Sequence, residues 1–242
     1  MELSKKYMKK LNQKFMPKKS SPTSKTSLRK RRAHRMVQVL KKMYPHPKTE
    51  LLYDTKFQLV VAVMLSAQCT DKVVNRVTKT LFKKYRTVND FANATPRVFQ
   101  KEVSSIPFFR NKTKAIIDSA KKIRDDFGGR VTKDANDLQT LPGIGYKTAH
   151  VIVGELFDQW EGIPTDTHVR RFAIRFDLTD NTDLNSISKD LENIVPKRDW
   201  RYVNNGLVLY GRYVCPAKKH DCANHPLTTI FPDANDIWPK AK

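Results

Sequence analysis

The clearest indication of the fold is the stretch Leu141-Pro142-Gly143-Ile144-Gly145-Tyr146-Lys147-Thr148-Ala149, which continues into the helical run HVIVGELF. Two glycines around one apolar residue permit a tight turn and let the backbone approach another molecule closely, while Ile144 enters the core. The N–H groups at the start of the following helix suit a phosphate oxygen. The pattern therefore predicts a helix-hairpin-helix in which Gly143, Ile144, Gly145 and Thr148 contact a DNA backbone without reading sequence. An ordinary turn between two helices is the alternative.

The charge of the chain points to the same class of partner. The 242 residues include 46 Lys and Arg against 24 Asp and Glu, a formal net charge of +22, and such a surface attracts polyanions. Residues 1–34 carry twelve Lys or Arg and one Glu and are rich in Ser and Lys. We therefore expect a disordered basic arm that attracts phosphates. Ribosomal and other basic structural proteins fit the same numbers.

Composition also argues against two other classes of protein. No apolar run reaches the roughly 20 residues that span a bilayer, and the first residues lack the apolar segment of a secretory signal. Three cysteines, Cys69, Cys215 and Cys222, are too few for a disulfide framework, which favours a reducing compartment. We expect no membrane partner. The expected localisation is with DNA, in the cytoplasm of a prokaryote or the nucleus of a eukaryote.

Helical periodicity begins at residue 28 and continues along the chain. Apolar residues recur at three and four positions, as in Met36, Val37, Leu40 and Met43, and no segment alternates with period two. We expect an all-α protein of eight to eleven short helices, packed as two subdomains with a ligand cleft between them. The expected ranges are a folded part at 35–232, a central subdomain of six helices at about 55–160, a second subdomain from about 28–54 plus 161–225, and a tail at 233–242.

Lys147 and Asp166 are the candidate catalytic pair. Lys147 lies in the first turn of a predicted helix, where the positive end of the helix dipole disfavours the ammonium and favours the free amine. Such an amine can attack C1′ of a sugar and form a Schiff base. Asp166, in PTDTH, has the composition of an N-cap, and its carboxylate can stabilise positive charge at C1′ and assist proton transfer. The alternatives are a phosphate-binding lysine and an aspartate that only caps its helix.

Two motifs taken together, LPGIGYKTAHVIVGELF (141–157) and IPTDTHVRRFAIRF (163–176), resemble the signature of the endonuclease III family of DNA glycosylases. The resemblance covers about residues 35–225 and implies the helix-hairpin-helix glycosylase fold, with the active site in the cleft. It also implies that double-stranded DNA with damaged bases or abasic sites is the partner, and that AP lyase activity accompanies removal of oxidised pyrimidines such as thymine glycol. Further similar segments are MLSAQCTDKVVNRVTKTLF (64–82), IPFFRNKTKAIIDSAKKI (106–123) and WRYVNNGLVLYGRYVC (200–215).

The resemblance assigns roles to single residues. Lys147 matches the nucleophile, which monofunctional adenine glycosylases lack, and Asp166 matches the catalytic carboxylate. Gln68 matches the side chain that fills the gap left by the extruded base. Phe108 stands at the position of an apolar wedge, a task that suits phenylalanine; without the resemblance, an exposed helix end and a core aromatic are equally good interpretations of these two residues. The other candidates are Lys112 as a DNA contact and Ser66, Asp71 and His168 near the base pocket, of which Ser66 and Asp71 suit cap and turn positions equally well.

The C-terminal segment departs from the family. The family commonly ends with four cysteines around a [4Fe–4S] cluster, whereas this chain has Cys215, Cys222, His225 and Phe231 at those positions. Four thiolates are the usual requirement, so we expect no cluster and no required cofactor. Zinc bound by Cys215, Cys222, His225 and His220 is chemically allowed, but the spacing fits no common zinc pattern, and we expect two free thiols ahead of zinc. A structural monovalent cation on the hairpin carbonyls is a further candidate.

Three functions remain open on the sequence. The first is the bifunctional glycosylase and AP lyase, acting as a monomer. The second is a glycosylase of other specificity, for mismatches, adenine or oxidised guanine, because Tyr146 stands where the family often has Arg. The third is a DNA-binding module without catalysis. The presence of both Lys147 and Asp166 speaks against the module.

Overall fold

The protein, seen here as a computed structural model, is described over residues 24–239, and within that range it is helical without a strand. This confirms the all-α prediction. No helix in the described range is long and apolar enough to cross a membrane. The α-helices are α2 (Lys25–Met43), α3 (Lys56–Ser66), α4 (Asp71–Lys84), α5 (Val88–Ala92), α6 (Pro96–Glu102), α7 (Phe109–Asp126), α8 (Ala135–Gln139), α9 (Tyr146–Phe157), α10 (Thr167–Arg175), α11 (Leu184–Ile194) and α12 (Leu207–Tyr213), joined by a π turn at Tyr202–Gly206 and 3₁₀ turns at Lys197–Asp199, Thr228–Ile230 and Pro232–Asn235.

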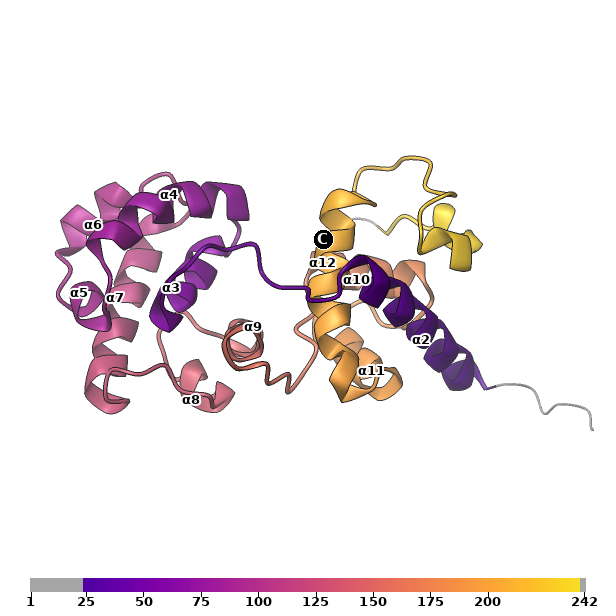
Figure 1. Ribbon diagram of the computed structural model, residues 1–242, viewed down its shortest axis with the longest axis horizontal. Helices are drawn as coiled ribbons and strands as arrows, with labels where there is room; N and C mark the ends of the chain where they lie inside the picture. The colour runs from indigo at the N-terminus through magenta and orange to yellow at the C-terminus, as the bar shows by residue number, and fades with distance from the viewer. Residues whose placement is uncertain (1–23, 240–242) are drawn as a thin grey trace, which may run out of the picture.

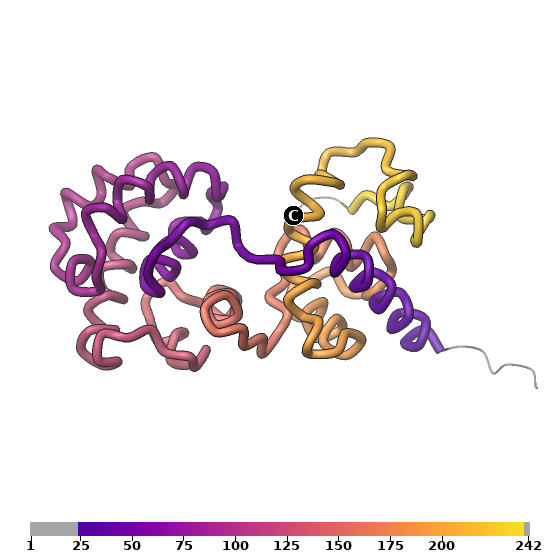
Figure 2. The backbone as a smooth tube through the Cα atoms, in the orientation of Figure 1, coloured from indigo at the N-terminus to yellow at the C-terminus, as the bar shows by residue number. Residues whose placement is uncertain are grey.

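The helices form two groups, each around its own hydrophobic core. One core is built from α3 to α9 and the other from α2, α10, α11, α12 and the segment that follows them. Figure 1 shows these groups side by side, with α9 facing the second group. The chain crosses between the groups after α2 and returns after α9, as the tube in Figure 2 shows. Residues near these crossings therefore lie between the two cores.

Helix α3 is the central element of the first group. It begins with a capping box, in which Thr55 accepts a hydrogen bond from the Gln58 N–H at 3.2 Å while the Gln58 side chain accepts from the Thr55 N–H. The Gln58 amide also donates to the Tyr85 carbonyl at 3.3 Å, so this polar side chain is satisfied although it is 1% exposed. The buried helix carries Ser66 and the following loop to the boundary between the groups.

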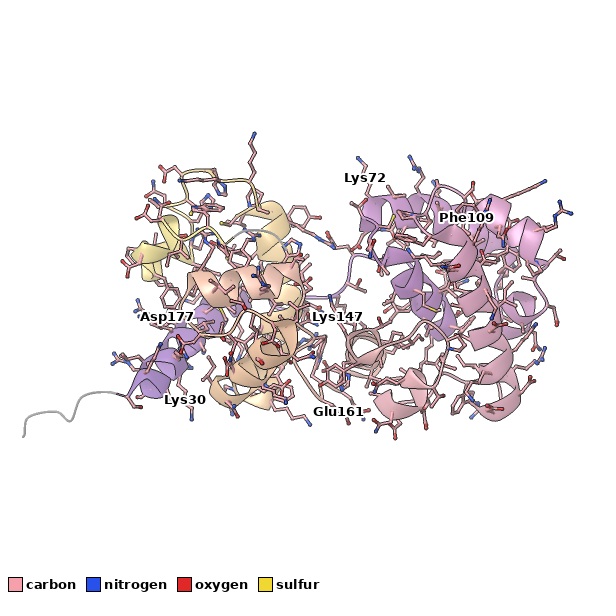
Figure 3. The ribbon with its side chains drawn as sticks, turned by 180° about the vertical axis from the view of Figure 1, so that it is seen from behind. Lys30, Lys72, Phe109, Lys147, Glu161 and Asp177 are labelled. Carbon is pink, nitrogen blue, oxygen red and sulfur yellow. The ribbon has the colours of Figure 1, made fainter. Side chains whose placement is uncertain are left out.

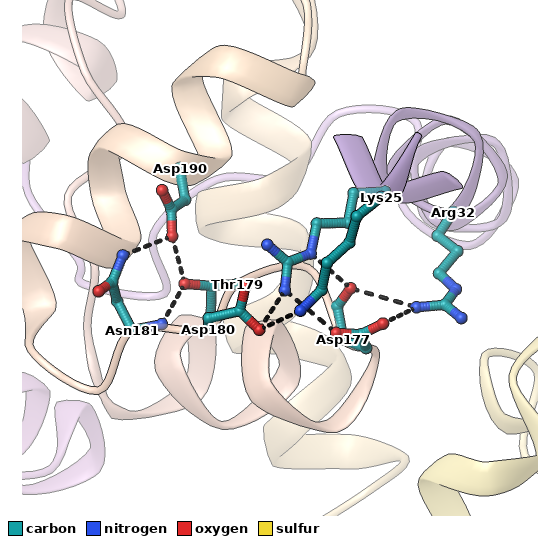
Figure 4. Close-up of polar contacts among 8 residues, drawn as sticks. Lys25, Arg32, Asp177, Thr179, Asp180, Asn181 and Asp190 are labelled. Atoms are coloured by element: carbon teal, nitrogen blue, oxygen red, sulfur yellow. Dashed lines mark hydrogen bonds and ion pairs between the residues drawn. The ribbon is translucent and has the colours of Figure 1, made fainter. Parts of the chain in front are cut away.

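The predicted basic arm is shorter than expected, because α2 begins at Lys25 and not after residue 34. The start of this helix is held by ion pairs to the turn after α10: Lys25 to Asp180 at 2.6 Å, Arg29 to Asp180 at 2.8 Å, and Arg32 to Asp177. Figure 4 shows this network. Local composition alone predicted disorder, whereas residues 25–34 are helical, pair with these distant carboxylates and place Ala33 in the second core. The rest of the predicted arm, residues 1–23, lies outside the described residues.

The predicted tail at 233–242 also starts too early. Ala234 is buried in the second core, and the Trp238 ring lies 4.1 Å from the guanidinium carbon of Arg175. The Trp238 indole donates a hydrogen bond to the Asn235 carbonyl at 2.7 Å. The chain therefore remains packed through Trp238, because an aromatic ring and a buried arginine give this Pro-rich segment tertiary contacts that its weak periodicity does not reveal.

Candidate active site

The predicted hairpin connects α8 to α9. Gly143 has φ +78, and a Cβ there would lie 3.0 Å from the Ala115 Cβ, so both its conformation and its surroundings require glycine. Ile144 is 4% exposed and anchors the turn in the first core. The Ser119 hydroxyl donates to the Pro142 carbonyl at 3.1 Å, which ties the hairpin to α7. Gly145 is the N-cap of α9 and offers no side chain, so the first N–H groups of α9 are left open to a ligand.

Lys147 and Asp166, predicted from separate motifs, line one cavity of about 330 Å³. Lys147 lies in the first turn of α9, and Figure 3 shows it between the two groups of helices. Among the described residues, its ammonium makes no ion pair within 4.0 Å. Asp166 is the N-cap of α10, where one carboxylate oxygen accepts the N–H groups of His168 and Val169, both at 2.8 Å. Capping therefore fixes the carboxylate while its second oxygen keeps no hydrogen bond in the described part of the chain.

The cavity lies at the boundary of the two cores. Ser66, Gln68, Asp71 and Thr148 line it from the first group, and residues around the π turn and α12 line it from the second. The Ser66 hydroxyl donates to the Val63 carbonyl at 2.8 Å, so it also completes the end of α3. Asp71 is paired with Arg212 at 2.7 Å. Both residues thus have structural partners as well as a place on the cavity wall.

His168 lies beside this cavity and not in its wall. It lines an adjoining pocket with Asp71 and Arg212. Burial lowers the pKa of His168, and the nearby Asp166 carboxylate opposes that effect. A Cβ at Gly211 would collide with His168 Nδ1, so this glycine on α12 makes the room that the imidazole occupies.

Gln68 and Phe108 share an uncommon backbone conformation. Their φ angles are 55 and 58, in the left-handed region that non-glycine residues seldom adopt, and strained positions of this kind cluster at functional sites. Gln68 is exposed on the rim of the cavity, and Phe108 is 62% exposed, which excludes the interpretation of Phe108 as a core aromatic. Phe108 does not line the cavity itself.

Lys112 holds the segments of these two residues together. Its ammonium donates to the carbonyl oxygens of Leu65 at 2.8 Å and Ala67 at 2.6 Å, directly before Gln68. Burial lowers the pKa of Lys112. Its ammonium is therefore engaged within the protein, and a contact of Lys112 with DNA stays a prediction.

Sequence reasoning missed two polar groups of the cavity. Arg212 bridges Asp71 and Glu50, with a distance of 2.5 Å to the Glu50 carboxylate. Glu155 accepts from the Thr49 N–H at 3.1 Å and from the Asn205 amide at 2.5 Å, and burial raises its pKa. A single carboxylate within the apolar helix 146–157 was the available signal for Glu155, whereas nothing in the sequence marked Arg212.

A second chemical group lies away from the cavity, after α12. Cys215, His220, Cys222 and His225 each offer one ligand atom, and these four atoms all lie within 4.8 Å of one another. Both cysteines are buried and neither is in a disulfide. The chain therefore has a compact Cys/His group near its C-terminus.

The comparisons with known proteins agree with this arrangement. A family model described as HhH-GPD superfamily base excision DNA repair protein matches residues 61–197. Endonuclease III of Synechocystis sp. is 39% identical over 215 residues, which are 89% of this chain and 98% of that protein. Endonuclease III of Bacillus subtilis is 43% identical over 192 residues, which are 78% of this chain and 86% of that protein. A solved non-covalent Endonuclease III–DNA complex has a TM-score of 0.78 at 34% identity and covers 86% of this chain and 97% of that chain. The chain therefore belongs to the endonuclease III family, within the HhH-GPD superfamily of base excision DNA repair proteins.

Proposed function

We propose that this protein is a bifunctional DNA glycosylase and AP lyase that removes oxidised pyrimidines, such as thymine glycol, from double-stranded DNA. The observation that carries the proposal is the common cavity of Lys147 and Asp166, with Gln68 on its rim. A solved relative, 36% identical with a TM-score of 0.76, is a trapped Endonuclease III–DNA covalent intermediate, which supports a covalent mechanism for this chain.

DNA binding starts at the hairpin in this proposal. The open N–H groups of α9 bind a phosphate, and the excess of positive charge strengthens the attraction to the backbone. Phe108, exposed at the start of α7, wedges into the base stack, and Gln68 fills the position of the base that leaves it. The extruded base enters the cavity of about 330 Å³, and its sugar then lies beside Lys147 and Asp166 in the cavity wall.

The chemistry follows from the two side chains. The Lys147 amine forms a bond to C1′ while the glycosidic bond breaks, and the base leaves with the bonding electron pair and takes a proton from water. Asp166 stabilises the positive charge that develops at C1′ and accepts the proton that the lysine nitrogen loses. Asp166 returns this proton to the ring oxygen O4′ as the C1′–O4′ bond breaks, and the opened sugar is a Schiff base with the lysine nitrogen. Loss of a proton from C2′ then breaks the C3′–O bond, nicks the strand 3′ to the lesion, and hydrolysis releases the lysine.

No cofactor takes part in these steps. The family's [4Fe–4S] cluster does not fit the side chains present, because Phe231 occupies the fourth cysteine position and packs on Phe176 with ring centroids 5.0 Å apart. A monovalent cation between the hairpin carbonyls and a phosphate is compatible with the mechanism in a structural role. The relatives named above are bacterial, which supports action on DNA in the cytoplasm.

Borohydride trapping tests the proposal. Labelled duplexes with thymine glycol or an abasic site are treated with the protein and with Lys147→Ala, and binding is measured on the same duplexes. We expect a covalent adduct on both substrates that requires Lys147, with duplex affinity largely retained because phosphate contacts supply it. An adduct on the abasic duplex alone would overturn the base specificity. Tight binding without any adduct would identify a DNA-binding module.

A further inference from the structure

The Cys/His group after α12 has the chemistry of a metal site. Two buried thiols, Cys215 and Cys222, and two half-buried imidazoles, His220 and His225, place one ligand atom each within 4.8 Å of all the others. Two sulfur and two nitrogen atoms are a complete tetrahedral ligand set for Zn²⁺. The proposed glycosylase chemistry uses none of these four residues.

The two imidazoles present unpartnered nitrogens. His220 Nδ1 lies 2.7 Å from the Lys218 carbonyl oxygen, so Nδ1 carries the hydrogen and Nε2 carries the lone pair. His220 Nε2 is buried and has no hydrogen-bond partner, and neither has the buried His225 Nδ1. Metal-binding histidines commonly donate their other ring N–H to a carbonyl in this way, which orients the ligand nitrogen. Burial of two such nitrogens without a partner in the protein is unfavourable, and an ion placed between them and the two sulfurs would supply that partner.

Arg175 provides a second, independent observation. Its side chain is 1% exposed and donates to the Cys215 sulfur at 2.9 Å and to the Cys222 sulfur at 3.0 Å. Its remaining hydrogen bonds go to the Ala234 carbonyl, and no carboxylate pairs with it in the described part of the chain. A neutral thiol is a weak acceptor, whereas a metal-bound thiolate keeps negative charge. A buried guanidinium directed at two sulfurs therefore suits thiolates better than thiols.

We propose that Cys215, His220, Cys222 and His225 bind one structural zinc ion. Zinc bonds of about 2.0–2.3 Å separate tetrahedral ligand atoms by roughly 3.3–3.8 Å, so the four atoms need to move together only slightly. Binding releases the two thiol protons to solvent and forms two Zn–S and two Zn–N bonds without a change of oxidation state. The ion holds the exposed segment 216–219 and the following turn against α10 and Trp238.

The competing arrangement is a pair of free thiols. Cys222 Sγ lies 3.3 Å from the Asn235 side-chain oxygen, a distance at which a thiol can donate a hydrogen bond. A free-thiol pair leaves both imidazole nitrogens unpartnered, however, and gives Arg175 two weak sulfur acceptors beside the Ala234 carbonyl. A zinc ion would bind both imidazole nitrogens and would make both sulfurs thiolates, which are stronger acceptors for Arg175.

Metal analysis of the untagged full chain, purified without chelators, tests the proposal. We expect about one zinc per chain by mass spectrometry, with neither iron nor acid-labile sulfide in comparable amount. Exchange for Co²⁺ should give tetrahedral ligand-field bands in the visible and a thiolate-to-cobalt charge-transfer band. A chelator should lower the melting temperature of the wild-type protein.

Variants locate the site. His225→Ala and His220→Ala should weaken zinc affinity by at least about tenfold, since loss of a direct ligand costs no less than loss of a residue that orients one, and should reduce the effect of the chelator on melting. His34→Ala, an exposed histidine on α2, and Cys69→Ser should keep full zinc content. Single histidine variants are preferred to Cys222→Ser because both imidazoles are only half-buried, so their removal disturbs packing less.

Two results would overturn the proposal. Iron with sulfide and the visible absorption of a cluster would mean that the family cofactor binds in spite of Phe231. Absence of metal, no uptake of Zn²⁺ or Co²⁺ by the reduced folded protein, and two titratable thiols at Cys215 and Cys222 would mean free cysteines. AP lyase activity is measured in parallel and does not depend on the outcome, so failure of the zinc site is distinguishable from failure of the proposed function.

Discussion

The Lys112 ammonium lies 2.6 Å from the Ala67 carbonyl oxygen, and this hydrogen bond joins α7, whose N-cap is Phe108, to the loop that carries Gln68. Both residues adopt left-handed backbone conformations, so each depends on its surroundings to stay in place. Lys112 thus links the segments that carry the two side chains proposed to act on the same base pair.

We expect Lys112→Met to weaken base extrusion more than DNA binding. The variant removes the donor of the Leu65 and Ala67 carbonyls, at a cost of about 1 kcal/mol in stability, because one of these hydrogen bonds is part-buried and the other is exposed. Stopped-flow fluorescence of 2-aminopurine placed at the target site measures extrusion. Lys114→Met is the matched control, because the Lys114 side chain is 82% exposed on the same helix. Equal extrusion rates in the two variants would refute the role of Lys112.

The two hairpin glycines should respond differently to alanine. Gly143→Ala is expected to destabilise the protein by at least about 1 kcal/mol, because it combines a positive φ with a Cβ 3.0 Å from Ala115. A Cβ at Gly145 meets nothing within 4 Å, so Gly145→Ala should keep its stability and lose only phosphate affinity. Thermal unfolding and DNA titration separate these effects. Equal destabilisation by both substitutions would contradict the structural assignment.

Asp166→Asn should separate capping from catalysis. Asparagine is as good an N-cap as aspartate, so we expect α10 to remain stable within about 0.5 kcal/mol. Loss of the charge should slow single-turnover base release by roughly 10²–10⁴-fold, the usual range for a group active in proton transfer. Asp166→Ala serves as the comparison, since it should also lose about 1 kcal/mol of stability. Unaltered turnover in Asp166→Asn would remove Asp166 from the mechanism.

Attachment of α2 should depend on pH through Asp180. Hydrogen bonds from Arg29 and Lys25 lower the Asp180 pKa from 3.8 to about 2. A lowered pKa in the folded state gives stability that is present above pH 3.8 and is lost as the pH falls towards 2. The melting temperature of Asp180→Asn should therefore lie below that of the wild type at neutral pH and approach it in acid.

Salt provides the control for the Asp180 effect. The side chain is 60% exposed, so the difference in melting temperature should be small and should shrink as ionic strength rises. Asp126→Asn removes another exposed pair, with Lys122, far from α2. A pH-independent difference for Asp180→Asn would show that the ion pairs do not hold α2.

Local patterns were sufficient for the features that depend on neighbours in the chain. Helical periodicity predicted the all-α class, and the glycine spacing predicted a hairpin in which Gly143 has φ +78. Asp166 was recognised as an N-cap because capping involves only the residues that follow it. Charge composition predicted DNA as the partner, but it placed the disordered arm too far into the chain, since the partners of Lys25 and Arg29 lie about 150 residues away.

Relationships between distant residues needed the tertiary structure. The common cavity of Lys147 and Asp166, the bond from Lys112 to Ala67 and the contact of Arg175 with Cys215, 40 residues apart, arise from packing of whole helices. Cysteine and histidine spacing matched no metal pattern, yet the folded segment after α12 brings one ligand atom each of Cys215, His220, Cys222 and His225 within 4.8 Å of the others. Spacing along the chain limits which side chains can come into contact. Packing of one element against another then determines which of these contacts form.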